Sequence, residues 1–287
     1  MAERIVDFRV GSDAEFLCLD GYDEVVNSSS YDASYNSCFG ADGNGVLFEA
    51  RPEPSKNPLE VVYNIQDIFF RQIITNQKFN NFKWIAGSYY CGYPLGGHIH
   101  FGLKGKIGMG ESSSYLDNYL GSISILLEKK NDGLYRRSSG YGRISDCRNQ
   151  PYGFEYRTPS SWLVSPYISA AFLCLAKTIM FEVLNNKKFK FNTYVDSRNF
   201  YLMQTEFVLT KFSEIWRDIT KMKLYQTYKP YLDILYFLVK NRLTWFPKHN
   251  MKTAWGVTKF NKLQILENNK IDLNTIWLNY SNETQTV

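Results

Sequence analysis

Hydrophobic and polar positions are patterned differently in the two parts of the chain. Over roughly the first 160 residues, short runs that alternate apolar and polar side chains lie between turns rich in Gly, Ser and Asp, which is typical of β-strands. Over roughly the last 120, apolar and aromatic residues recur at helical spacing and glycine is scarce. We therefore expect an α+β protein, with a sheet and helices over residues 1–190 and a helical region over 191–287 that packs on the same domain.

Capping signals and periodicity predict five helices. Asn57 and Pro58 supply a cap and a first-turn proline for a helix that should extend to about Asn76. Similar signals predict helices over residues 112–130, 166–185, 201–221 and 230–242. The segment 166–185 is the longest apolar stretch, but Lys177 and Glu182 interrupt it, so we expect a buried helix and no membrane span.

Four short segments each place two reactive side chains two positions apart, on one face of a predicted strand, with apolar residues on the other face. A solvated strand also alternates in this way, so one such segment would carry little weight. All four draw on carboxylate, imidazole and guanidinium groups, which favours a site for metal and phosphate. The pairs are Asp13 and Glu15, Glu49 and Arg51, His98 and His100, and Glu155 and Arg157.

The residue types indicate the chemistry of that site. Carboxylates gathered on one face repel one another unless cations lie between them. Oxygen ligands with one or two imidazoles suit Mg²⁺ or Mn²⁺ better than a structural zinc ion, and nearby arginines would contact phosphate oxygens. A second group of arginines lies in YRRSSGYGRISDCRNQPYGFEYR, which we expect to form a Gly/Ser loop before the last strand: Arg136, Arg137, Arg143 and Arg148.

Composition narrows the class of protein. The formal net charge of +5, without a basic tail, fits small anionic ligands and does not require nucleic acid. The five cysteines are odd in number and contain no C-x-x-C pair, so we expect a reducing compartment and no disulfide framework. The N-terminus lacks the features of a signal peptide, and we expect a cytoplasmic location. Because no Walker A or G-x-G-x-x-G motif occurs, metals and arginines would have to hold any nucleotide phosphates.

The order of these motifs resembles that of a known superfamily. GSDAEFLCL, FGADGNGVLFEARP, GGHIHFG and FEYRTPSS, with the arginines between the last two, are similar to the motifs of glutamine synthetases and their carboxylate-amine ligase relatives. More closely, they resemble the phage-type COOH-NH2 ligases, which are small amidoligases. The resemblance covers about the first 165 residues. It implies a curved, mainly antiparallel sheet with the active site on one face, helices on the other and a helical C-terminal layer.

The resemblance also implies roles for individual residues. Carried over by position, it gives His100 a place near the phosphate and makes Asp42, in GADGNG, a weaker candidate ligand. The implied metal ligands are Asp13, Glu15, Glu49, His98 and Glu155. The arginines implied to handle the substrate carboxylate and phosphate are Arg137, Arg143, Arg148 and Arg157, with Arg51 and Arg136 as further candidates for contacts to the nucleotide.

The implied reaction uses ATP and two divalent cations, Mg²⁺ or Mn²⁺. A small-molecule or peptide carboxylate would attack the γ-phosphoryl group to give an acyl phosphate, and an amine would then displace phosphate. The chain departs from glutamine synthetase because Asp13 stands where such motifs often have glutamate. Asp13 also lies too near the N-terminus for the small preceding domain of that enzyme, so neither its ring-shaped oligomer nor ammonia as the amine carries over.

Two alternatives come from other classes of protein. A metal-dependent hydrolase could use His98 and His100 as a His-x-His zinc site with His249 as a third ligand, although such enzymes have little use for so many arginines. A non-catalytic phage protein could retain the ligase fold, although none of the implied metal positions here is apolar. A role in nucleic-acid binding would rest only on NNKKFKFN at 185–192, which is more typical of a solvated helix end.

Overall fold

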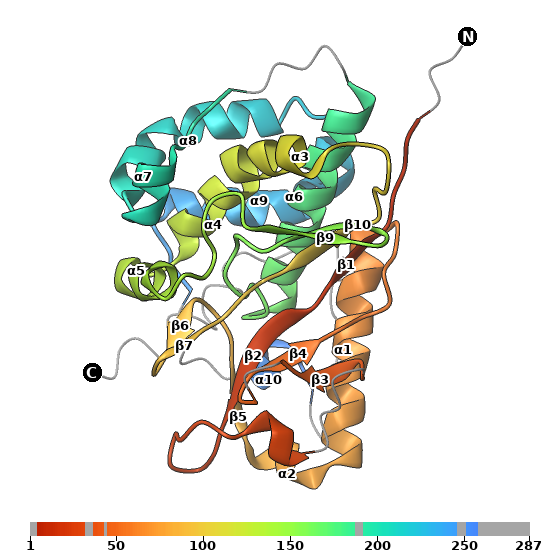
Figure 1. The fold of residues 1–287 in the computed structure, drawn as a ribbon, viewed down its shortest axis with the longest axis vertical. Helices are drawn as coiled ribbons and strands as arrows, with labels where there is room; N and C mark the ends of the chain where they lie inside the picture. Colours follow the sequence, from red (N-terminus) through yellow and green to blue (C-terminus); the bar gives the residue numbers. More distant parts are fainter. Residues whose placement is uncertain (1–4, 32–36, 43–44, 187–191, 246–250, 258–287) are drawn as a thin grey trace.

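The computed structural model describes residues 5–31, 37–42, 45–186, 192–245 and 251–257. Its strands form two four-stranded antiparallel sheets that are joined through the first two strands, β1 (Val10–Ser12) and β2 (Ala14–Leu19). These two strands follow one diagonal line through the molecule in Figure 1. Only Asp13 separates them, so this residue lies at the junction of the two sheets. The expected mixed fold with a mainly antiparallel sheet is confirmed.

The first sheet has the strand order β1-β8-β10-β9. It contains β8 (Ile99–Phe101), β9 (Cys147–Gln150) and β10 (Gly153–Tyr156). The register places His100 between two neighbours, with Gly11 opposite on β1 and Glu155 opposite on β10. The predicted pairs on these segments therefore share one face of the sheet.

The second sheet has the strand order β3-β4-β2-β5. It contains β3 (Phe39–Ala41), β4 (Phe48–Ala50) and β5 (Lys83–Ile85). Glu15 on β2 pairs directly with Glu49 on β4, so two carboxylates lie side by side. A short hairpin, β6 (Tyr89–Tyr90) and β7 (Tyr93–Pro94), leads from this sheet toward β8.

The alternation along β2 divides its side chains between two environments. Ala14, Phe16 and Cys18 belong to the main hydrophobic core, which includes residues of α1 (Pro58–Thr75) and α6 (Pro166–Asn185). On the other face, Glu15 lies at the site, while Leu17 and Leu19 form a small second core with Leu47, Ile85 and Leu95. The helix α1 contacts β1, β3 and β4, as Figure 1 shows. One face of β2 is thus committed to the main core, and the other is divided between the site and the small second core.

Helix α6 is long and apolar enough to cross a membrane, but 78% of its apolar window is buried within the protein. It packs against α1, α3 (Met109–Leu116) and α9 (Tyr225–Lys240). A helix covered on so many sides by its own protein has the surroundings of a core helix. The expectation of a buried helix at this position is confirmed.

The predicted helices occur in the structure, but their first and last residues differ from those expected. The expected helix 112–130 begins at Met109, passes through a π-helical turn (Asp117–Gly121) and ends with α4 (Ser122–Leu127). The expected helix 201–221 is divided into α7 (Ser197–Tyr201) and α8 (Thr205–Ile219), because Met203 adopts a positive φ of 49° between them. Helix α9 begins at Tyr225, so Pro230 lies in its second turn and does not start it.

Three short helices complete the described fold: α2 (Gln77–Asn81), α5 (Lys130–Ser138) and α10 (Met251–Ala254), with a 3-10 turn at Ser28–Tyr31. Helices α8 and α9 pack on α4, and α9 also packs on α6. The helices after residue 191 therefore contact those before it. The division of the chain at residue 190 stays a prediction.

The segment 251–257 docks on the main core through Trp255. This side chain is 0% exposed, its indole N–H donates to the carbonyl of Leu163 at 2.7 Å, and its ring meets that of Phe69 edge-on at 5.1 Å. The amide of Gln66 donates to the Trp255 carbonyl at 2.8 Å. The last described segment is thus fixed by both packing and hydrogen bonds.

We expect Trp255→Ala to lower the free energy of unfolding by about 3–5 kcal/mol, because it opens a large cavity in a closely packed core. The matched control is Tyr22→Ala, since Tyr22 is 90% exposed and its removal opens no cavity. Urea denaturation followed by circular dichroism measures both changes. Equal stability of the two variants would contradict the docking of this segment.

Candidate active site

The five implied metal ligands converge where the two sheets meet. Asp13 lies between β1 and β2, Glu15 and Glu49 face each other on β2 and β4, His98 precedes β8, and Glu155 lies on β10. They form two overlapping groups whose potential ligand atoms lie within 4.8 Å of one another. We call Asp13, His98 and Glu155 the outer cluster, and Glu15, Glu49 and His98 the inner cluster.

His98 belongs to both clusters and is buried, with 3% of its side chain exposed. Its Nδ1 lies 3.1 Å from Asp13 Oδ1 and 3.4 Å from Glu155 Oε1, while its Nε2 lies 3.8 Å from Glu15 Oε1. Burial alone would lower the pKa of His98, but the surrounding carboxylates outweigh burial and raise it to about 9. Without a cation, His98 is therefore protonated at neutral pH.

The carboxylates of the site have shifted pKa values for related reasons. Burial, together with the charges of Asp13 and Glu15, raises the pKa of Glu49 to about 8 even though Arg51 is paired with it. Burial also raises the pKa of Glu15. Burial would raise the pKa of Asp13 too, but contacts with His100 and His98 lower it well below its usual range. Crowded carboxylates thus keep protons or pair with imidazolium when no metal is bound.

The donor set fits a hard divalent cation. Glu155 is 1% exposed, and its Oε1 accepts no hydrogen bond within the described residues, although Arg157 Nε lies 3.1 Å away. A buried carboxylate oxygen of this kind is available to a ligand. The rest of each cluster supplies carboxylate oxygens and one imidazole, which is the ligand chemistry of Mg²⁺ or Mn²⁺.

A pocket of about 470 Å³ opens beside the outer cluster. Asp13, His100 and Arg51 lie at the end of the pocket that adjoins the ligands, and Tyr152 contributes an aromatic wall. His100 Nε2 lies 2.9 Å from Asp13 Oδ1, and its Nδ1 lies 2.7 Å from the hydroxyl of Tyr152, whose ring stacks on it. The other lining residues are Arg9, Gly11, Ser12, Pro52, Pro54 and Gly102.

Three of the predicted arginines lie next to the clusters. Arg157 and Arg148 reach Glu155 at 3.1 and 3.5 Å, and Arg51 pairs with Glu49. Arg148 is 57% exposed and Arg157 only 20%, so Arg157 is the more tightly held. Arg143 is exposed in the turn before β9, and its carbonyl accepts a hydrogen bond from Thr158. Asp42, the weaker candidate, follows β3 and lies near enough to influence the pKa values of Glu15 and Glu49.

The other two arginines lie elsewhere than expected. Arg136 and Arg137 are on helix α5, not in a Gly/Ser loop, and both are 0% exposed. The Arg136 guanidinium donates to the carbonyls of Leu95, Thr158 and Pro159 at 2.8–2.9 Å and to that of Arg157 at 3.3 Å. It therefore fixes the backbone around the site, and its donors are used on protein carbonyls.

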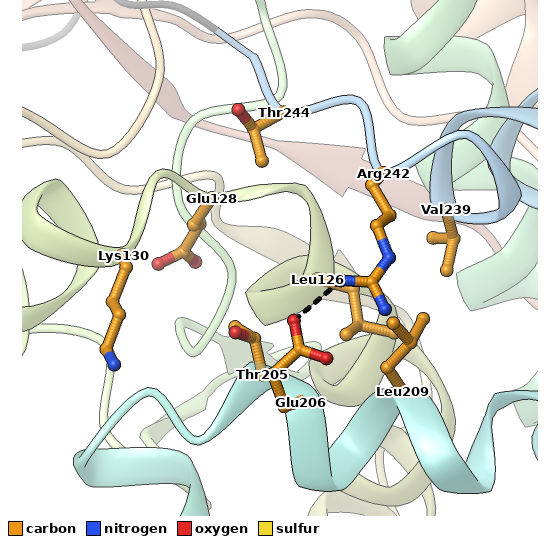
Figure 2. Close-up of a pocket in the computed structure, with 9 residues that line it drawn as sticks. All are labelled: Leu126, Glu128, Lys130, Thr205, Glu206, Leu209, Val239, Arg242 and Thr244. Carbon is orange, nitrogen blue, oxygen red and sulfur yellow. Dashed lines mark hydrogen bonds and ion pairs between the residues drawn. The ribbon is translucent and has the colours of Figure 1, made fainter.

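Arg137 is neutralised inside the protein. It pairs with both carboxylate oxygens of Glu128, at 2.6 and 3.2 Å, and its guanidinium lies over the ring of Phe200. Figure 2 shows Glu128 in the wall of a second, smaller pocket, where Glu206 and Arg242 form an ion pair at 2.9 Å. The structure does not place Arg137 among the residues that line the larger pocket.

Two contributors were missed by the sequence analysis. The hydroxyl of Tyr141 donates to Glu15 Oε1 and lies 3.1 Å from His98 Nε2, and the amide of Gln150 donates to Glu155 Oε2 at 3.0 Å. Tyr141 stands between glycines in SGYGR, which was a signal of a special turn. Only the folded chain shows that this turn enters the site. His249 lies outside the described residues.

The fold resembles that of a solved ligase. PafA, in the crystal structure of the complex between Prokaryotic Ubiquitin-like Protein Pup and its Ligase PafA, matches with a TM-score of 0.59 and 8% sequence identity, over 82% of this chain and 63% of that one. This chain thus spans less than two thirds of the PafA chain. At this identity the likeness shows the fold, which is of the glutamine synthetase type. A search of curated proteins found no match.

The class of protein is that of the carboxylate-amine ligases, because a model of such a family matches most of the chain. The chain belongs to the Phage phiEco32-like COOH.NH2 ligase-type 2 family, whose model matches residues 10–257. That range begins with β1 and ends just after Trp255, so it includes both clusters and every lining residue of the larger pocket except Arg9. The resemblance inferred from the motifs is confirmed.

We expect Arg137→Ala to lower the free energy of unfolding by about 3–5 kcal/mol, because it leaves the charge of Glu128 buried without its paired cation. Arg242→Ala is the matched control at the same small pocket: its ion pair with Glu206 is exposed, so its removal should cost less than about 1 kcal/mol. Chemical denaturation measures both. An Arg137→Ala variant with unchanged stability would overturn the structural role and favour the substrate role inferred from the motifs.

Proposed function

We propose that this protein is an ATP-dependent enzyme that joins a carboxylate to an amine through an acyl phosphate. The observation that carries the proposal is the pair of clusters that share His98 and adjoin an arginine-containing pocket. Membership of the ligase family and the fold shared with PafA support the reaction class. The nucleotide, the two cations and the intermediate extend the proposal beyond that class.

Two divalent cations would be held by these residues. Asp13 and Glu155 suit one, Glu15 and Glu49 suit the other, and His98 lies within reach of both. When bound, such cations neutralise phosphate charge and polarise the phosphoryl group. The protein's part is to keep the carboxylates together on paired strands and to supply Arg157 and Arg51 beside them.

The larger pocket is the candidate site for the nucleotide. Its volume of about 470 Å³ lies within the range of small-molecule sites. Among its lining residues, Arg51 and His100 suit phosphates, and Pro52, Pro54 and the ring of Tyr152 suit a flat base. In this arrangement the terminal phosphate would point toward the outer cluster.

The reaction balances without a further co-reactant. A carboxylate oxygen attacks the γ-phosphorus of ATP, the bond to the bridging oxygen breaks, and ADP leaves with an acyl phosphate formed. The amine nitrogen then attacks the acyl carbon, the carbon–oxygen bond to phosphate breaks, and an amide, phosphate and a proton result. Arg157, Arg148 and Arg143 lie near enough to the last strand to contact the anionic groups of either step.

The substrates are a carboxylate and an amine carried by small molecules or peptides. PafA is the ligase of a protein, Pup, which supports a polypeptide as one of the two partners here. The proposed compartment is the cytoplasm, which is reducing, and the described cysteines are all free. Neither a membrane nor a nucleic acid is required by this reaction.

The hydrolase alternative is disfavoured by how the two histidines are used. Among the described residues, each cluster of potential ligands contains His98 together with carboxylates, and neither contains His100. His100 instead stacks against Tyr152 at the pocket. A hydrolytic zinc site would be expected to use both imidazoles of the His-x-His pair on one ion.

Calorimetric titration of ATP with Mg²⁺ tests the proposal. We expect the intact protein to bind the nucleotide only when the cation is present. Glu155→Gln should weaken that binding by about 10–100-fold, which is typical when a metal site is perturbed. Glu24→Gln is the matched control, because Glu24 is exposed and lies outside the clusters. If the intact protein bound no nucleotide with Mg²⁺ or Mn²⁺, the ligase proposal would fail.

Cation binding should release protons. Glu49 and His98 have pKa values of about 8 and 9 without a cation, against ordinary values of 4.5 and 6.5, so both are largely protonated at pH 7. A cation requires their unprotonated forms, so its affinity should rise with pH and level off above about pH 9.

The released protons can be counted by titrating Mn²⁺ at pH 7 in two buffers with different ionisation enthalpies. We expect the apparent binding enthalpy to differ between the buffers, and the difference to shrink in Glu49→Gln. Identical enthalpies in both buffers would show that these groups do not give up protons to the cation.

A further inference from the structure

A Gly-Tyr-Gly turn after α5 carries one side chain into the site. Gly140 and Gly142 have φ values of +86° and +64°, which favour glycine, and a Cβ on Gly142 would lie 1.7 Å from an Arg136 nitrogen. The Tyr141 N–H donates to the Arg136 carbonyl at 3.2 Å, and the Gly142 N–H donates to the Asp146 carboxylate at 3.2 Å. The turn is therefore fixed at its backbone as well as by its glycines.

The ring of Tyr141 lies between two cations. The guanidinium carbon of Arg136 is 5.2 Å from the ring centroid, and that of Arg157 is 5.4 Å from it. Such contacts hold an aromatic ring in place without using its hydroxyl. The hydroxyl lies at Glu15 Oε1 and His98 Nε2, and its oxygen also accepts a hydrogen bond from Arg157.

The proton of the hydroxyl settles the direction of both contacts. A phenol has one proton, and Glu15, ionised as a cation ligand must be, can only accept, so Tyr141 donates to Glu15. Its oxygen then has lone pairs but no proton for His98, so the contact of 3.1 Å requires His98 Nε2 to carry hydrogen. When His98 is neutral, its free lone pair must then be on Nδ1, the atom that faces Asp13 and Glu155.

We propose that Tyr141 is a positioning residue that commits His98 to the outer cluster by keeping a proton on its Nε2. This inference rests on the proposed function and resolves which cluster His98 serves. The cation of the outer cluster would be held by Asp13, His98 Nδ1 and Glu155, and that of the inner cluster by carboxylates alone. An outer partner that fixes the tautomer of a ligating histidine commonly changes metal affinity when it is removed.

The test is Tyr141→Phe, which keeps the ring between Arg136 and Arg157 and removes only the hydroxyl. In the protein with ¹⁵N-labelled histidine, we expect a protected Nε2–H signal from His98 before any metal is added, and its loss to exchange in the variant. On addition of Mg²⁺, the intact protein should show the Nδ1 resonance of His98 shifting while Nε2 stays protonated. Mn²⁺ titrations should show the tighter of two binding events weakened about 10–100-fold in the variant.

Tyr152→Phe is the matched control, since its hydroxyl contacts the other histidine of the pair, His100, at 2.7 Å. It should alter the His100 signals and leave the protected Nε2–H of His98 in place. The melting temperature of Tyr141→Phe should stay close to that of the intact protein, which separates loss of the hydroxyl from loss of fold.

The outcomes distinguish this inference from the proposed function. If His98 carries its proton on Nδ1, the inference is wrong even when ATP binds. It is also wrong if Tyr141→Phe leaves both the His98 signals and Mn²⁺ binding unchanged. If the protein binds neither cation nor nucleotide, the proposed function fails, and the Nε2–H signal of the metal-free protein still decides the hydrogen bond from which the inference starts.

Discussion

The register of two antiparallel strand pairs is the constraint on which the site depends. Pairing of β2 with β4 sets Glu15 opposite Glu49, and pairing of β10 with β8 sets Glu155 opposite His100. A shift of one residue would turn a whole strand over and exchange its two faces. Such a shift would remove Phe16 from the main core, where it contacts the rings of Phe39, Phe48, Phe69 and Trp84. Packing of the hydrophobic core therefore fixes the strand register, and the register fixes the positions of the candidate ligands.

That arrangement has an electrostatic cost which the protein offsets locally. Four carboxylates surround one imidazole, and burial raises the pKa values of Glu15 and Glu49. Arg51 and Arg157 lie beside the clusters, and protonated His98 supplies a further positive charge. Burial of Glu15 and Glu49 costs free energy, because their charged forms are better solvated in water. Strain of this kind is typical of a site kept for a ligand.

Much of this could be predicted from the sequence because strand periodicity is local. The alternation around Asp13, Glu49, His98 and Glu155 is visible in the chain, and the structure brings all of these residues together. The arginines were harder, because nothing local distinguishes Arg136, which binds carbonyls, from Arg157, which reaches the clusters. The helix α5 was missed since Gly and Ser crowd its end. The role of Tyr141 depends on contacts more than 40 residues away in the chain.

The position of Arg136 explains why the site can be built from such short strands. Its guanidinium ties the end of the β6–β7 hairpin, at Leu95, to the segment that follows β10, at Thr158 and Pro159. The planar fork of arginine satisfies several carbonyls at once in a fixed geometry, and the Gly97 N–H also donates to that of Pro159. The same guanidinium packs on Tyr141. Arg136 thus fixes the backbone on both sides of the candidate ligands, and it also holds the ring of Tyr141, whose hydroxyl contacts His98. The geometry of the site therefore depends on α5 as well as on the sheet.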